Sequence, residues 1–205
     1  MFYAYHLFFA IAAGVFSVIA FVPYIRAIIK GQTKPSGASW WTWSLLAGIT
    51  IASSRSAGAP IQVLILPAWL CFSQLGVAFL SLRYGDNNWD LLNKLCVGGA
   101  LFGIVLWFIT GQPLIALLLS VIADFFASIP NIRHVWTHPE QEDRLGWTLG
   151  WLSGVFEVLA ISTWSFAESG WATYFLLHQT AVLFLVWRPF FIRISNQPIS
   201  QQAVQ

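Results

Sequence analysis

Two acidic side chains lie inside long apolar segments, where a carboxyl group is rarely kept without a function. Asp124 is near the middle of the segment Leu114 to Trp136, and Glu157 is near the middle of Gly146 to Trp164. Placing either charge at the centre of a bilayer costs about 2.5 to 3.5 kcal/mol on insertion scales. His178, at mid-depth of a third apolar segment, is a candidate partner for either acid. These residues predict proton coupling at Asp124 and Glu157; the alternative is a structural hydrogen-bonded pair with protonated acids.

Two glutamines also lie at mid-depth. Gln74 is near the middle of the segment Pro60 to Leu82, and Gln179 is near the middle of Gly170 to Ile192. An amide both donates and accepts hydrogen bonds, so two amides facing one cavity can hold a polar solute. The alternative is hydrogen bonding between helices, which contributes about 0.6 kcal/mol on average in membrane proteins. The residues themselves leave both interpretations open.

Tryptophan is unusually frequent, with 12 residues, and most of them fall at the ends of apolar segments. That placement is typical of the aromatic belt at a membrane surface. Trp43 and Trp151 lie a turn or more inside the segment ends, and Trp69 is close to the middle of its segment. These three either stack on a ligand or pack against neighbouring helices, and packing is the favoured interpretation for any one of them.

Signatures of catalysis and of metal binding are absent from the sequence. There is no cluster of Cys or His at metal-ligand spacing, no glycine-rich phosphate loop and no nucleophile elbow. Nothing in the spacing of Asp124, Glu157 and His178 recommends a nucleophile and its base. We expect a protein that is not an enzyme and that carries neither a metal nor another cofactor.

The composition places this chain in a lipid bilayer. Hydrophobic residues make up 58% and charged residues only 9%, whereas soluble domains are about one quarter charged. Seven apolar segments approach the length needed to cross a bilayer. They are Tyr5 to Ile29, Ser39 to Ser54, Pro60 to Leu82, Leu91 to Thr110, Leu114 to Trp136, Gly146 to Trp164 and Gly170 to Ile192. The predicted fold class is an all-α membrane protein with seven transmembrane helices.

The basic residues give the orientation. Of the ten, Arg55 alone falls on one side of the predicted membrane, and the others fall on the opposite side. These others are Arg26, Lys30, Lys34, Arg83, Lys94, Arg133, Arg144, Arg188 and Arg193. Because basic loops stay in the cytoplasm, the N-terminus is predicted outside and the C-terminus inside, in a plasma membrane or a bacterial inner membrane. Topology accounts for the net charge of +2, so no nucleic-acid partner is expected.

The sequence repeats itself. A shift of 107 positions lays Ser17 to Ile29 over Asp124 to Trp136, and a shift of 105 lays Ser73 to Arg83 over His178 to Arg188. The pairs that chance does not explain are Pro23 with Pro130, Arg26 with Arg133, Trp40 with Trp147 and Gln74 with Gln179. This predicts a three-helix repeat at 1–82, a linker helix at 83–113, a second repeat at 114–193 and a disordered cytoplasmic tail at 194–205. A single linker helix makes the two repeats parallel, and transporters bind solute at the midplane between such repeats.

Two segments carry a family resemblance: PYIRAIIKGQTKPSGASWWTW from Pro23 and PNIRHVWTHPEQEDRLGWTLGW from Pro130. With the topology they make the chain similar to the SWEET and PQ-loop (MtN3-like) superfamily, which includes sugar facilitators, lysosomal amino-acid exporters and the KDEL receptor. The family's Pro-Gln pair reads Pro-Tyr at Tyr24 and Pro-Asn at Asn131. The second and sixth segments also lack the proline that sugar facilitators carry.

The resemblance implies a transporter or facilitator that moves a small polar solute, a sugar or an amino acid, by alternating access. The alternative is a receptor of the KDEL-receptor type that binds its ligand without transport. Pro23 and Pro130 then act as hinges; the alternative is a static kink, since proline is tolerated in transmembrane helices. The other expected gate residues are Tyr24, Arg26 and Arg133, and the expected solute-binding residues are Gln74, Gln179, His178, Trp43, Trp151, Trp69 and Asn131. One chain can enclose a cavity by itself, and a homo-oligomer remains possible.

Overall fold

The computed structural model describes residues 2–31, 35, 37–85, 91–137, 139 and 144–195. Within these residues the chain is all-helical, with seven α-helices and one short 3-10 helix, η1. The elements are α1 (Phe2–Ile29), α2 (Gly37–Ser56), η1 (Ile61–Leu64), α3 (Ile65–Tyr84), α4 (Leu91–Thr110), α5 (Pro113–Thr137), α6 (Arg144–Leu159) and α7 (Phe166–Ser195). The sequence predicted seven helices, and this part of the prediction is confirmed.

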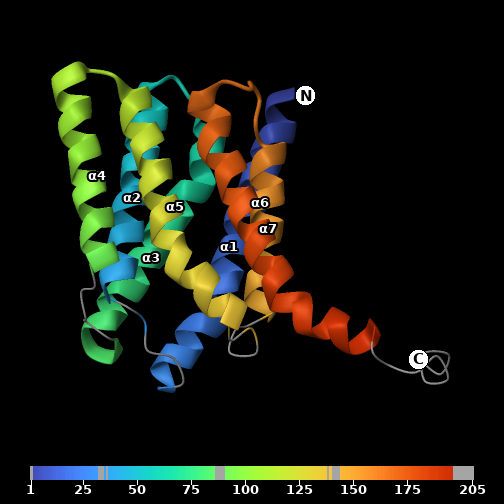
Figure 1. The fold of residues 1–205 in the computed structure, drawn as a ribbon. Coiled ribbons are helices and arrows are strands. Elements are labelled where there is room, and N and C mark those ends of the chain that lie inside the picture. The colour runs from blue at the N-terminus through green and yellow to red at the C-terminus, as the bar shows by residue number, and fades with distance from the viewer. Residues whose placement is uncertain are drawn as a thin grey trace.

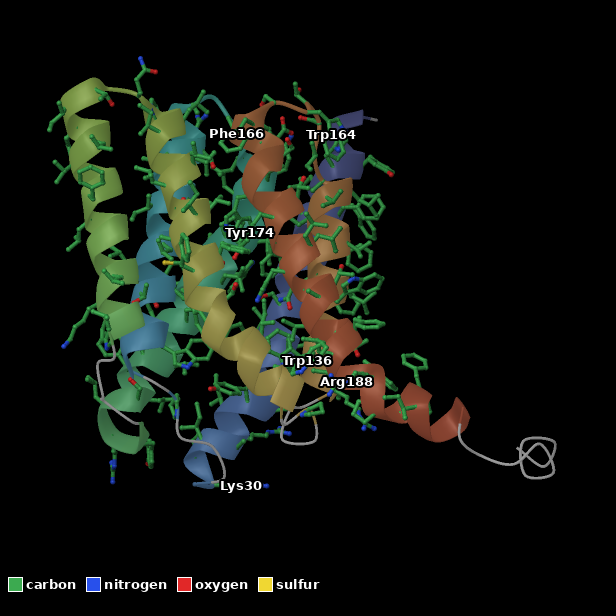
Figure 2. The ribbon with its side chains drawn as sticks, in the orientation of Figure 1. Lys30, Trp136, Trp164, Phe166, Tyr174 and Arg188 are labelled. Carbon is green, nitrogen blue, oxygen red and sulfur yellow. The ribbon has the colours of Figure 1, made fainter. Side chains whose placement is uncertain are left out.

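The helices run side by side in alternating directions. In Figure 1, α1, α3, α5 and α7 run from the end that holds the N-terminus toward the opposite end, and α2, α4 and α6 run back. Figure 2 shows Trp164 and Phe166 at the first of these ends, called the upper end here, and Lys30 and Arg188 at the other, the lower end. As a result, α1 and α5 point the same way.

Helix packing follows the same pattern twice along the chain. In the first half α3 packs against both α1 and α2, and in the second half α7 packs against both α5 and α6. The halves meet where α1 packs on α6 and where α2 packs on α5. Exchanging the first three helices with the last three leaves this pattern unchanged. The helix α4 packs against α5 and α2 and forms one edge of the bundle.

Three of the helical stretches are long and apolar enough to cross a membrane: Ala4–Ile29, Ile61–Tyr84 and Phe166–Ile192. Large apolar side chains also cover the outside, including Phe72 and Phe108, which are 71% and 83% exposed. Exposure on this scale is typical of a surface that faces lipid. The structure therefore supports membrane integration, and the other four predicted spans remain predictions.

Several predicted helix ends differ from the observed ones. The sixth segment was expected to continue to Trp164, but α6 ends at Leu159 because the chain turns at residues 160–165. The seventh was expected to begin at Gly170, but α7 begins at Phe166 and continues to Ser195, two residues into the expected tail. The carboxylate of Glu168 in the first turn of α7 accepts hydrogen bonds from the chain before it, which fixes this earlier start.

Prolines bend two of these helices. Pro23 lies inside α1 and Pro189 lies inside α7. A proline lacks the amide hydrogen and clashes with the carbonyl four residues earlier, so the helix bends there. In Figure 1 the lower parts of α1 and α7 leave the direction of their upper parts, and α5 bends in the same region. No role for Pro189 was predicted from the sequence.

An apolar cluster, called the upper cluster here, joins the two halves at the upper end. Its buried residues come from η1 and its flanks on one side and from the ends of α6 and α7 on the other. They are Ala59, Val63, Leu64, Ile161, Ala167 and Ala172. Burying apolar area contributes about 25 cal/mol per Å² in water. The cluster therefore favours contact between the halves at this end of the bundle.

Candidate functional site

Asp124 is hydrogen-bonded to a tyrosine that the sequence analysis did not select. The hydroxyl of Tyr174 on α7 donates to Oδ2 of Asp124 on α5, at 2.6 Å. Figure 2 shows Tyr174 about midway between the upper and lower ends. Asp124, predicted at mid-depth, therefore has a specific hydrogen-bond partner, and its partly buried carboxyl group is satisfied.

His178 lies beside this pair but does not bind either acid. Its ring is stacked on that of Tyr174, with centroids 6.3 Å apart and an interplanar angle of 17°. The indole of Trp147 on α6 meets it edge-on at 6.5 Å. The buried Nε2 of His178 has no hydrogen-bond partner. In this structure Tyr174 is the hydrogen-bond donor to Asp124, and both carboxylate oxygens of Glu157 have no partner, so the pairing of His178 with either acid is not observed.

Asp124, Tyr174, His178 and Trp147 together form what we call the polar row. It draws side chains from α5, α7 and α6, all in the second half of the chain. The row offers a carboxyl group, a hydroxyl and an imidazole nitrogen that has no partner. Such groups can bind a polar solute by hydrogen bonds, and a carboxyl group next to a hydroxyl can also accept and release a proton.

Gln179 extends the row toward α6. It is buried, and a Cβ added to Gly150 would lie 3.1 Å from its Nε2, so the amide lies directly against the backbone of α6. Its Oε1 has no hydrogen-bond partner, and neither has the buried Oε1 of Gln74 on α3. Each of these two glutamines, predicted to bind solute, thus has a side-chain oxygen that accepts no hydrogen bond. Gln179 is placed between α6 and α7, next to His178, and the prediction of a cavity shared with Gln74 remains a prediction.

Glu157 is separate from the polar row. It is completely buried, and neither of its carboxylate oxygens has a hydrogen-bond partner. It belongs to a buried face of α6 with Gly150, Ser153 and Gly154. The neighbouring residue, Phe156, packs on Phe9 and Phe16 of α1, at the junction between the halves.

The internal repeat relates this junction, between α1 and α6, to the junction between α2 and α5. At a shift of 107, Glu157 corresponds to Thr50, and Ala13 corresponds to Ser120. The hydroxyls of Thr50 and Ser120 lie 3.3 Å apart and join α2 to α5. The equivalent junction of α6 with α1 has an acid in place of the threonine and an alanine in place of the serine. The two junctions between the halves are therefore chemically different.

The three tryptophans selected from the sequence make packing contacts. Trp43 packs against an apolar cluster between α2 and α5. The Nε1 of Trp151 donates to the hydroxyl of Thr180 on α7, at 3.0 Å. Trp69 is 47% exposed and lies over Gly14 of α1, where an added Cβ would be 2.3 Å from its ring. The tryptophan of the polar row is instead Trp147, which lies at the end of its predicted apolar segment, where an aromatic belt is expected.

The predicted gate residues are described for the first half of the chain. Pro23 bends α1, the ring of Tyr24 packs on that of Trp40 at 5.2 Å, and Arg26 is exposed in the last turn of the helix. Pro130, Asn131 and Arg133 lie within α5, but their side chains are outside the described residues.

The sequence analysis missed a polar contact between the halves at the upper end. Glu168 is buried, and its carboxylate accepts from the backbone and hydroxyl of Ser162, at 2.5 and 2.7 Å, and from the backbone of Thr163, at 3.0 Å. The amide of Gln62 on η1 donates to the hydroxyl of Ser162 at 3.4 Å. We call Gln62, Ser162 and Glu168 the upper latch. It lies with the upper cluster, at the same end of the bundle.

Comparisons with known proteins give no family assignment. No protein-family model matches the chain, and no curated protein or solved structure matches it. Among the described residues, no group of three His, Cys, Asp or Glu side chains is arranged to hold a metal ion. The function is therefore inferred from the repeat and from the geometry of the polar row.

Proposed function

We propose that this protein is a membrane carrier, not an enzyme, which moves a small polar solute between the two sides of a bilayer by alternating access. The solute is a sugar or an amino acid, and the chain belongs with the SWEET and PQ-loop type of carrier. Two parallel three-helix units and the linker helix α4 form the transport unit. The N-terminus lies outside and the C-terminus in the cytoplasm, because the lower end carries Lys30 and Arg188.

The observation that carries this proposal is the repeated packing of the helices. Each half places its third helix between its first and second, and each half meets the other through its first and second helices. A carrier needs two units that can change their relative position around a site at mid-depth. The sequence repeat and the packing pattern both supply such units, and Tyr174 of the polar row lies at mid-depth in Figure 2.

The polar row is the proposed solute site, with Asp124 as its proton-linked group. The open nitrogen of His178 and the open oxygen of Gln179 are hydrogen-bonding groups for the solute. When Asp124 takes up or releases its proton, its hydrogen bond to Tyr174 changes, and with it the contact between α5 and α7. Because α5 also packs against α2 of the first half, a change in the contact between α5 and α7 can alter the junction between the two halves.

The described conformation is the one closed at the upper end. The upper cluster and the upper latch join the halves there, while at the lower end the last part of α7, beyond Pro189, leaves the bundle in Figure 1. We assign it to the state in which solute exchanges with the lower, cytoplasmic side.

Counterflow in proteoliposomes tests this function. Vesicles loaded with one unlabelled sugar or amino acid at a time are mixed with the same labelled solute, and accumulation of label reports exchange through a carrier. We expect one chemical class to give accumulation, and we expect Asp124→Asn to alter its pH dependence. A matched variant of an exposed residue on α5, Phe125→Leu, should behave as the parent. The carrier proposal is abandoned if no solute exchanges while ligand binding to the same protein is measured, since a receptor then fits better.

A further inference from the structure

A cavity of about 460 Å³ lies at the lower end of the second half, and no residue of the polar row lines it. It is lined by Arg144, Arg188, Pro189, Phe190 and Ile192. Its volume falls within the range of about 300 to 1,000 Å³ that small-molecule sites occupy. Two guanidinium groups thus share one cavity with two large apolar side chains.

Aromatic rings hold both guanidinium groups in place. Arg144 lies over the ring of Trp187, 5.6 Å from its centroid, and Arg188 lies over the ring of Trp136 at 4.7 Å. Arg188 also donates to the backbone carbonyl of Trp136 at 2.9 Å. Within the part of the chain that the structure describes, neither arginine forms an ion pair. Stacked arginines keep their outer N–H groups free for an oxyanion, because stacking uses the face of the group and not its edge.

The apolar side of the cavity continues into the surface that faces lipid. Pro189 bends α7 just after Arg188, and the helix then leaves the bundle at the lower end. Phe190, Phe191 and Ile192 on this bent part are 41%, 58% and 52% exposed. Trp136, beneath the Arg188 side chain, is 58% exposed. A ligand at the arginines therefore meets an apolar surface immediately beside its charge.

We propose that this cavity binds the phosphate of an anionic phospholipid of the cytoplasmic leaflet, with the acyl chains along Phe190 and Ile192. A phosphodiester can take hydrogen bonds from both guanidinium groups, and its acyl chains need the adjoining apolar surface. Basic cavities at the cytoplasmic ends of transmembrane helices suit anionic head groups because the leaflet there is negatively charged. The site rests on the membrane placement in the proposed function, but not on transport.

Native mass spectrometry of the purified full-length chain tests the proposal, by titration with phosphatidylglycerol and, separately, with phosphatidylcholine. We expect the parent to retain one phosphatidylglycerol in preference to phosphatidylcholine. Arg144→Gln and Arg188→Gln should each weaken the binding of phosphatidylglycerol about fivefold and leave that of phosphatidylcholine unchanged. The matched control is Arg83→Gln, an exposed arginine at the same end that lies over Tyr84 and outside the cavity.

Three results overturn the proposal: no preference for phosphatidylglycerol in the parent, equal weakening by Arg83→Gln, or inorganic phosphate or glycerol 3-phosphate competing as well as the lipid. The last result would mean a site for a soluble anion. If Arg188→Gln fails to fold, Arg188→Lys, which keeps the charge, replaces it in the lipid titration. Counterflow of the same variants in phosphatidylcholine vesicles tests transport separately from lipid binding. We expect the variants to exchange solute at the parent rate in these vesicles, which lack the anionic lipid.

Discussion

The hydrogen bond between Tyr174 and Asp124 is the closest contact in the candidate site, and its removal is a small change. Tyr174→Phe deletes the hydroxyl that donates to Asp124 at 2.6 Å and keeps the ring that stacks on His178. A hydrogen bond to an acidic group contributes about 1.5 to 3 kcal/mol, so we expect a measurable loss of thermal stability. We also expect the pH profile of solute uptake to shift, as it should in Asp124→Asn. Tyr5→Phe, at a 51% exposed ring on α1, is the control. An unchanged pH profile in both site variants would falsify the proton-linked role of this pair.

A glycine at a close helix contact gives a second test at the scale of single residues. An added Cβ at Gly14 of α1 would lie 2.3 Å from the ring of Trp69, whereas at Gly48 of α2 nothing lies within 4 Å. Gly14→Ala must therefore displace a large side chain, and we expect it to lower the free energy of unfolding by about 1 to 3 kcal/mol. Gly48→Ala should be neutral or slightly stabilising, because alanine favours the helix. Thermal unfolding in detergent compares the two, and equal melting temperatures would contradict the close packing of Trp69 on α1.

The sequence could predict which residues are polar at mid-depth, but not which of them meet. Periodicity places Asp124 and His178 in apolar segments, yet the partner of each depends on helix rotation and on crossing angles, which side-chain packing determines. Tyr174 was missed for this reason, since a tyrosine in an apolar helix resembles many others. Its spacing of four residues from His178 was the available signal, because residues at that spacing share a helix face.

At the scale of elements, the turn between α6 and α7 depends on one carboxylate. Glu168 accepts two backbone amides and one hydroxyl from Ser162 and Thr163. Glu168→Ala leaves these donors without their partner. Each donor that stays buried then lowers the free energy of unfolding by about 1 to 3 kcal/mol. We expect a lower melting temperature and a more open upper end.

A cysteine at Ser165 in the same turn reports this opening, because its reaction with an impermeant thiol reagent should be faster in the Glu168→Ala background. Ser169→Ala is the control, since Ser169 is in the same turn of α7 and bonds only the carbonyl of Ser165. If the reaction rate is the same in all three backgrounds, the upper latch does not restrain the turn.

The ends and bends of the helices could be predicted only in part. Apolar length located all seven helices, but it carried the sixth to Trp164, since Ile161 and Trp164 are as apolar as the helix itself. The turn is set instead by hydrogen bonds to Glu168, which come from tertiary structure. The bend at Pro189 follows from its residue type, but the cavity beside it depends on how α6 and α7 pack and could not be predicted from the sequence.

At the scale of the whole molecule, the proposed orientation rests on the distribution of charge. Lys30 and Arg188 lie at the lower end in Figure 2, and Arg55 closes α2, which runs to the upper end. Because basic residues stay on the cytoplasmic side, we expect a cysteine introduced at Gln205 to be protected from an impermeant reagent in intact cells. It should react once the cells are permeabilised. A cysteine at Ser165 should show the opposite behaviour, and labelling of Gln205→Cys in intact cells would reverse the topology.

Alternating access requires the two halves to move against each other, and one contact allows that motion to be blocked. The hydroxyls of Thr50 and Ser120 lie 3.3 Å apart across the junction of α2 with α5. Replacing both with cysteine, in a background without Cys71 and Cys96, brings two sulfur atoms close to the 2.03 to 2.05 Å of a disulfide after a small adjustment. We expect the oxidised double variant to bind solute but to stop exchanging it.

Reduction should restore counterflow, since the thiols leave the junction free to move. The single variants Thr50→Cys and Ser120→Cys should exchange solute whether or not oxidant is present, which controls for the substitutions and for the reagent. Mass spectrometry confirms that the disulfide has formed. If the cross-linked protein still exchanges solute at the parent rate, the junction of α2 with α5 stays fixed during transport. Relative motion would then have to occur where α1 packs on α6, the junction in which Glu157 stands in place of Thr50.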